Sequence, residues 1–99
     1  MEESENWACT LPTAERPLRL AEFDALLAGA ARHRPTRTRL VLDLEPRPEV
    51  VAQAADLAVR ETGCCSFFTF ELTATGGGLT LAISVPDAQT EVLDALAAR

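Results

Sequence analysis

The chain has no lysine, a single histidine and no long uninterrupted apolar run. Because a membrane span needs about 20 apolar residues in a row, no segment is expected to cross a membrane. One histidine, His33, does not supply a histidine-based metal site or a serine–histidine–aspartate catalytic set. The glycines at 76–78 lack the GK[ST] ending of a phosphate-binding loop and the helix that follows it.

Basic side chains are outnumbered, with 9 arginines against 15 acidic residues and a net charge of −6. An acidic surface repels phosphate groups, which argues against nucleic acid or an anionic membrane as a direct partner. The acidic start of the chain does not resemble a secretion signal, so we expect a cytoplasmic protein. Thiols in that compartment are reduced, and the odd number of cysteines, three, favours free or metal-bound thiols over a structural disulfide.

The 99 residues, 47% of them hydrophobic, are enough for one core and not for two. We therefore expect a single domain over residues 1–99, in which the acidic residues 1–6 are mobile. Apolar residues at helical spacing predict helices over about 19–32, from 49 to a stop at Gly63, and after an N-cap at Asp87. Alternating apolar residues predict strands at 40–44, 68–73 and 79–85, the last two joined as a hairpin through the glycines at 76–78.

This order of elements predicts an α/β protein of the α+β type. The expected architecture is a two-layer sandwich, a small mixed sheet with helices on one face, of ferredoxin-like or split β-α-β character. The polar stretch at 33–39, which contains Pro35, is expected to be a connection. Three strands leave sheet edges open, so we expect residues 7–11, around Cys9, or a second copy of the chain to cover one. The predicted core comprises Leu40, Leu42, Leu44, Phe68, Phe70, Leu72, Leu79, Leu81 and Ile83.

The conspicuous chemistry is an adjacent cysteine pair, Cys64 and Cys65, between the middle helix and the second strand. Adjacent side chains point to opposite faces of a strand and diverge by roughly 100° in a helix. Only a bend beside Gly63 therefore lets both sulfurs reach one ion. The pair follows a helix C-terminus and adjoins phenylalanines, and both features disfavour a reactive thiolate, which argues against redox catalysis.

Soft ions of low coordination number bind two or three sulfurs and need no histidine. The sequence therefore predicts a soft-metal or metalloid site for mercury, trivalent arsenic, monovalent copper or lead. Cys64 and Cys65 are its ligands and Cys9 is a candidate third. Zinc fits less well, because a structural zinc ion requires four ligands. The competing interpretation, about equally supported, is that these cysteines are buried and simply pack beside the phenylalanines.

Two further features have a functional and a structural interpretation. Glu61 lies one helical turn before Cys65 and could accept a thiol proton or ligate an ion, although a glutamate at such a position is more often exposed. A basic cluster could bind phosphate or an acidic partner, but we favour a solvated connection that complements a helix C-terminus. The cluster consists of Arg32, His33, Arg34, Arg37 and Arg39.

Residues 61–70 fit the pattern E-x-x-C-C-x-F-[FL]-x-F. This pattern resembles a poorly characterised small bacterial family whose segments are also fused to some MerR-type metal-responsive regulators. The resemblance extends to the CTLPTA segment at 9–14 and covers most of the chain. It implies metal or thiol-reactive sensing. Because the DNA-binding part of those regulators has no counterpart here, it also implies a partner such as a MerR-type regulator.

Three functions stay open, in order of preference. The first is a soft-metal or metalloid binding protein that acts as a sensor, carrier or detoxification accessory. The second is a non-catalytic module, dimeric or bound to a partner, whose cysteines are structural. The third is an enzyme with Cys64 or Cys65 as nucleophile, for which Glu61 is the only base nearby in the sequence.

Overall fold

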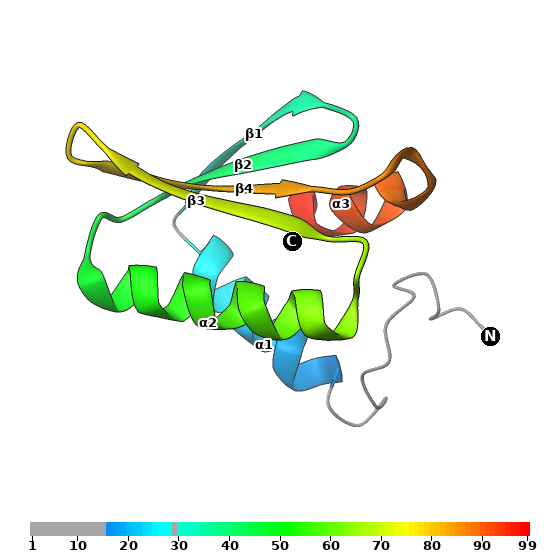
Figure 1. Ribbon diagram of the computed structural model, residues 1–99, viewed down its shortest axis with the longest axis horizontal. Coiled ribbons are helices and arrows are strands. Elements are labelled where there is room, and N and C mark those ends of the chain that lie inside the picture. Colours follow the sequence, from blue (N-terminus) through cyan, green and yellow to red (C-terminus); the bar gives the residue numbers. More distant parts are fainter. Residues whose placement is uncertain (1–15, 29) are drawn as a thin grey trace.

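The computed structural model describes residues 16–28 and 30–99, with side chains for 21–28, 30–63 and 65–99. In Figure 1 the strands form one layer and the helices cover one of its faces, which is the expected α+β two-layer sandwich. The expectations of a mobile segment at 1–6 and of a sheet edge covered by residues 7–11 concern residues outside the described part of the chain. No helix in the described part of the chain is long and apolar enough to cross a membrane. The elements are α1 (Arg16–Leu27), β1 (Ala31–Thr36), β2 (Arg39–Leu44), α2 (Pro48–Cys64), β3 (Thr69–Thr75), β4 (Gly78–Ser84), the 3-10 turn η2 (Asp87–Gln89) and α3 (Thr90–Ala97).

The sheet has the strand order β1-β2-β4-β3, and every neighbouring pair is antiparallel. Because β2 and β3 are both antiparallel to β4, they run parallel to each other with β4 between them. Helix α2 connects β2 to β3, so these elements form the expected split β-α-β unit. The expectation of mixed strand pairing is wrong, because β4 separates the two parallel strands and β1 adds another antiparallel pair.

Strand β1 was not predicted from the sequence. The first helix ends at Leu27 instead of continuing to residue 32, and the expected connection at 33–39 is largely a hairpin of β1 and β2. Arg32 and Arg34 are half-buried, while His33 and Pro35 are exposed. Long arginine stems therefore cover the core where a strand would normally show apolar residues. Pro35 is tolerated because β1 is an edge strand whose register shifts between His33 and Thr36.

The core lies between the two central strands and the helices. Leu40, Leu42 and Leu44 of β2 are opposite Ile83, Leu81 and Leu79 of β4, and all six side chains are buried. Apolar residues of the helices complete this core: Phe23, Leu26, Leu27, Ala54, Leu57, Val92, Leu93 and Leu96. The alternation read from the sequence thus gave the correct register for β2 and β4.

Strand β3 is less buried than expected. Phe70 is half-buried and Leu72 is 36% exposed, because β3 is an edge strand. The predicted hairpin between β3 and β4 is confirmed. Its turn residues, Gly76 and Gly77, have φ values of 58° and 81°. Positive φ at both central residues is typical of a type I′ turn, in which glycine avoids the strain of a side chain.

Two helix ends differ from expectation. Helix α2 begins with Pro48, which has no amide hydrogen to satisfy, and it continues past Gly63 to Cys64. Asp87 does not cap α3. It is the first residue of the turn η2, whose N-cap is Pro86, and the N-cap of α3 is Gln89. Neither of these caps makes a side-chain hydrogen bond. The Asp87 carboxylate instead accepts a hydrogen bond from Nη2 of Arg37 at 3.2 Å.

We predict that replacing Leu42 by alanine destabilises the protein far more than the same change at Leu72. Leu42 is 0% exposed in a central strand, and such a truncation costs about 2–5 kcal/mol through lost burial and the cavity left behind. Leu72 is partly in water, so its loss is expected to cost less than about 1 kcal/mol. Urea unfolding of both variants measures the difference, and equal losses would contradict the described core.

The last residue of the chain is anchored to α1. Arg99 donates from Nε to Oδ1 of Asp24 at 2.6 Å and from Nη2 to Oδ2 at 2.7 Å. These hydrogen bonds and the positive charge of Arg99 hold the pKa of Asp24 below its ordinary value. Because the pKa is lowered in the folded state, the pair stabilises the fold above the ordinary pKa of aspartate. That contribution is lost as the pH falls through the lowered value.

We predict that Arg99→Gln raises the pKa of Asp24 towards its ordinary value. The neutral side chain removes both the charge and the paired donors that favour the carboxylate. An NMR titration of the Asp24 carboxyl carbon in the folded protein measures the change directly. An unchanged titration midpoint would show that Arg99 does not bind Asp24 in solution.

Candidate functional site

The candidate site is the junction between α2 and β3. Cys64 is the last residue of the helix, and Cys65 has the extended backbone angles φ −126° and ψ 90°. The Cys65 amide donates to the Glu61 carbonyl at 2.7 Å, and the Phe68 amide donates to the Cys65 carbonyl at 3.2 Å. These two bonds close the end of the helix and the turn that follows it. The cysteine pair therefore lies at a bend, as expected.

Cys65 is completely buried, with 0% of its surface exposed, and it belongs to the hydrophobic core. It takes part in a disulfide. The expectation that its thiol is free or metal-bound is therefore wrong for this state of the protein. The other cysteines of the chain are Cys9 and Cys64, and their side chains lie outside the described residues. Sequence spacing alone does not show which sulfurs the fold brings to bonding distance, and this is why the disulfide was not anticipated.

Three phenylalanines follow Cys65 in the turn after α2 and at the start of β3. The ring centroids of Phe67 and Phe68 are 4.7 Å apart, and those of Phe68 and Phe70 are 5.2 Å apart. Phe68 is part of the core, and the other two rings are half-buried and pack against it. Tilted rings at these separations attract one another and exclude water. The region around Cys65 is therefore largely apolar.

Glu61 is the one buried charged residue in the part of the chain whose side chains are described, with 2% of its surface exposed. The expectation that it is exposed on the helix surface is wrong. Glu61 follows Ala54 and Leu57 along the buried stripe of α2, and it lies one turn before Cys65. Glu61 and Phe68 also have interaction partners beyond these contacts. A buried glutamate one helical turn before a buried cysteine distinguishes this junction from ordinary core packing.

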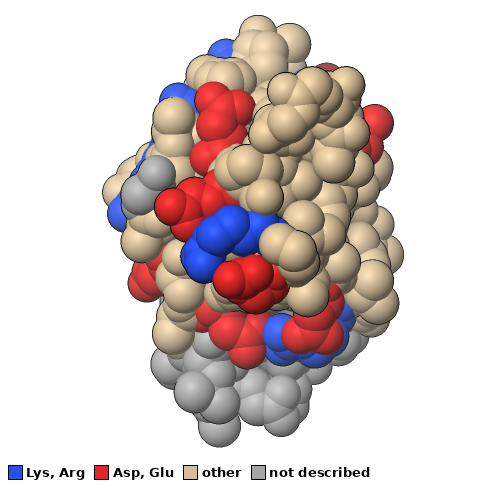
Figure 2. All heavy atoms as spheres, turned by 90° about the vertical axis from the view of Figure 1, so that its left-hand side faces the viewer, with Lys and Arg blue, Asp and Glu red and all other residues tan. Residues whose placement is uncertain are grey.

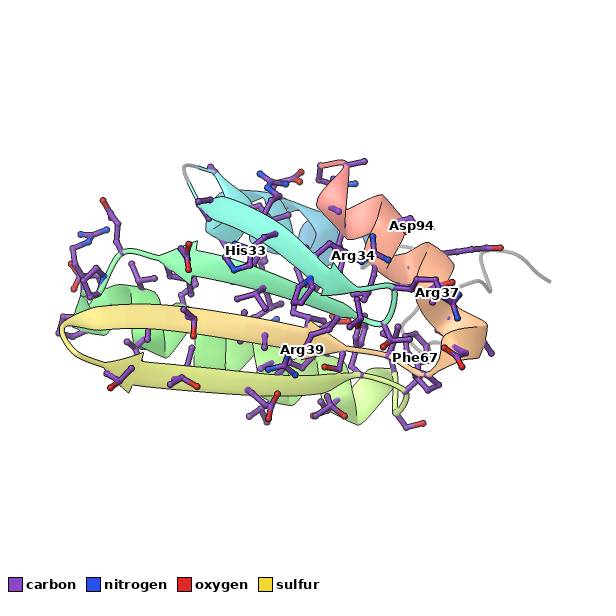
Figure 3. All side chains as sticks on the ribbon, turned by 90° about the horizontal axis from the view of Figure 1, so that it is seen from above. His33, Arg34, Arg37, Arg39, Phe67 and Asp94 are labelled. Carbon is purple, nitrogen blue, oxygen red and sulfur yellow. The ribbon has the colours of Figure 1, made fainter. Side chains whose placement is uncertain are left out.

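The basic cluster makes contacts within the protein. Figure 3 shows Arg34 beside Asp94, and the two side chains form an ion pair at 2.8 Å. Arg37 pairs with Asp87 at 3.2 Å, and Arg39 pairs with Glu71 at 2.6 Å.

Arg32 donates to the carbonyl oxygens of Leu27 at 3.2 Å and Ala97 at 3.4 Å, near the ends of α1 and α3. The interpretation that this cluster complements helix C-termini is therefore confirmed for Arg32. His33 is exposed on β1, apart from the cysteine junction. The structure gives no support for a phosphate site at the cluster, because its arginines already bind acceptors of the protein itself.

Within the described side chains, no three His, Cys, Asp or Glu residues are close enough to hold a metal ion. The predicted ligands Cys9 and Cys64 lie outside these described side chains. Comparisons of the chain with protein-family models, with curated proteins and with solved structures found no match.

We predict that the unreduced, denatured protein has one reactive thiol per chain and that the reduced protein has three. A disulfide at Cys65 uses two of the three cysteines. Titration with a thiol reagent before and after reduction counts them, and three thiols before reduction would contradict the disulfide. Trypsin leaves Cys64 and Cys65 in one peptide, because no arginine lies between Arg60 and Arg99. A cross-link to the peptide that carries Cys9 would identify Cys9 as the partner, and its absence would identify Cys64.

Proposed function

We propose that this protein binds one soft metal or metalloid ion through Cys64 and Cys65, with Cys9 as a third ligand. It would act as a sensor, carrier or detoxification accessory. The observation that supports the proposal is that the buried sulfur of Cys65 is bonded to a second cysteine sulfur. Two sulfurs that the fold brings to bonding distance separate on reduction, and they remain neighbours that can bind the same ion.

The disulfide is then the oxidised, ion-free form of the site. A thiol reductant of the cytoplasm, where we propose that the protein acts, supplies two electrons and two protons and converts the disulfide into two thiols. A soft ion displaces those protons when it binds, because the thiolate is the ligand. Binding therefore overcomes the cost of an ionised sulfur in an apolar environment.

The surroundings of Cys65 favour complexes without net charge. Burial of an isolated charge is costly, and Cys65 and Phe68 both belong to the apolar core. Mercury(II) with two thiolates and arsenic(III) with three are neutral. Copper(I) with two thiolates and lead(II) with three each carry one negative charge. Among the expected ions, mercury and trivalent arsenic therefore fit best, and zinc with four ligands fits least.

Full burial of Cys65 also favours a second candidate, in which the disulfide only stabilises an interaction module. The two functions differ in the effect of reducing the disulfide. Reduction removes the stabilisation that a structural disulfide provides, whereas it makes the thiols of a metal site available to bind an ion. An enzyme with Cys65 as its nucleophile is less well supported, because a sulfur with 0% exposure is not accessible to a bulky substrate. Both the metal-binding protein and the interaction module would act with a protein partner. This partner is either a second copy of the chain or a MerR-type regulator. The resemblance at residues 61–70 motivates the regulator, and we propose no direct contact with nucleic acid.

We predict that the reduced protein competes for mercury(II) or arsenite better than a small dithiol does. Replacing Cys64 or Cys65 by serine should weaken binding at least tenfold, because serine keeps the size but lacks the soft donor. Cys9→Ser should have a smaller effect. Apparent affinity should fall as the pH falls, because protons compete with the ion for the thiolates. Equilibrium competition titrations of the wild type and the three variants measure these effects.

Melting curves of the same reduced proteins serve as the control. If the cysteines only pack, serine at position 65 lowers the melting temperature because it buries a hydroxyl group. In that case the wild type takes up no stoichiometric ion. Such a result would contradict the proposed metal site and favour the interaction module.

A further inference from the structure

Two large hydrophobic side chains are exposed in the described part of the molecule, Val59 at 71% and Leu72 at 36%. They belong to α2 and β3, which are in contact with each other. In Figure 3 α2 runs beneath β3 and β4, while α1 lies beneath the β1 side of the sheet. The free edge of β3 and the side of α2 that faces away from α1 therefore form one continuous surface.

That side of α2 carries no charge. At 100° per residue, Glu49, Asp56 and Arg60 share the side of the helix that faces α1, where Arg60 pairs with Glu22. The opposite side presents uncharged residues: Val51, Ala55, Ala58 and Thr62, with Val59 at the outer rim. In Figure 2 this side of the molecule is on the right and is mostly tan, whereas charged side chains gather on the left and below. We call it the α2–β3 flank.

The two sheet edges differ in how they resist pairing with another strand. The β1 edge carries Pro35, a register shift and half-buried arginines, all of which discourage a new strand. The β3 edge has no proline, and its one charged residue, Glu71, already pairs with Arg39. None of the described strands pairs with the outer edge of β3. Within the described residues, this seven-residue strand, rich in threonine and apolar residues, therefore has a partner strand on one edge alone.

The hairpin turn shows which backbone groups of β3 point away from β4. In a type I′ hairpin the residues that flank the turn, Thr75 and Gly78, bond to each other, and bonded pairs then alternate along the strands. The amide and carbonyl groups of Phe70, Leu72 and Ala74 therefore point outward. Leu72 is the central residue of β3. Two copies of this strand can pair antiparallel about a two-fold axis at Leu72 and exchange hydrogen bonds there.

We infer that a second copy of this chain docks on the α2–β3 flank. The two β3 edges join into one continuous eight-stranded sheet, and the uncharged sides of the two α2 helices pack against each other beneath it. A second copy carries the same net charge of −6, so it is repelled by an acidic surface. The α2 side of this flank is uncharged on both copies, and the one charged residue of β3, Glu71, is paired with Arg39. An antiparallel strand edge is also self-complementary, as a two-fold interface requires. This inference specifies the homodimer within the proposed function and does not depend on the thiol chemistry.

Sedimentation equilibrium of the full chain, reduced and without metal, tests the interface. The wild type should be a dimer at micromolar concentration. Leu72→Lys sets two lysines against each other at the two-fold axis, and Ala55→Glu adds a charge to the flank. Each should raise the dissociation constant at least about tenfold. The matched controls Ala31→Lys, on the β1 edge, and Gln53→Glu, on the α1 side of α2, should change it less than about threefold.

Hydrogen exchange distinguishes a second copy from coverage by the same chain. If two copies pair, the amides of Phe70, Leu72 and Ala74 become protected as the protein concentration rises. A wild type that stays monomeric at a protein concentration of about 100 μM overturns the inference. Amide protection that does not change with protein concentration also overturns it. A dimer that responds equally to the test and control variants overturns it as well. Because metal is absent, none of these results depends on whether the cysteines bind an ion.

Discussion

The pairing of β2 with β4 is the interaction on which the rest of the fold depends. These central strands set the two rows of leucine and isoleucine that face the helices. Each of them also holds an edge strand, β1 on β2 and β3 on β4. Helix α2 connects β2 to β3 across β4, which lies between those strands. This crossing carries the end of α2 back to the core, where Cys65 is buried.

Burial gives the α2–β3 junction its chemical character. A cysteine in the core is usually inert, because water is excluded and the thiolate is disfavoured. Here the chain also buries Glu61 one turn earlier and brings a second sulfur to bonding distance of Cys65. The sulfur of Cys65 is therefore buried and held in a disulfide, and we propose that after reduction it binds a soft ion instead. The same burial that stabilises the fold would therefore select ions that form neutral thiolate complexes.

Sequence reasoning succeeded where a periodic apolar signal coincides with a buried face. Leu40, Leu42 and Leu44 alternate because one side of β2 faces the helices, and the glycines at 76–78 marked the turn. It failed for β1, because the stems of Arg32 and Arg34 cover the core in place of apolar side chains. It overestimated the burial of Leu72, because alternation does not show which strand is at an edge.

The candidate site was predicted only in part. The bend at Cys64 and Cys65 follows from the end of a helix next to a strand pattern, and the structure has it. The burial of Glu61 also had a signal in the sequence, since this residue continues the spacing of Ala54 and Leu57, but a glutamate is rarely buried. The oxidation of Cys65 had no signal, because it depends on distances between sulfurs that only the folded chain sets.

Native mass spectrometry of the reduced protein, titrated with mercury(II), arsenite, copper(I) and zinc, tests most directly whether the junction is a metal site. It reports the number of ions retained and, from the mass, the number of protons displaced. The account predicts one mercury or arsenic per chain, the loss of a proton for every thiolate bound, and no retention of zinc. Reduced protein that retains no ion would contradict it, as would equal retention after Cys64 and Cys65 are both replaced by serine.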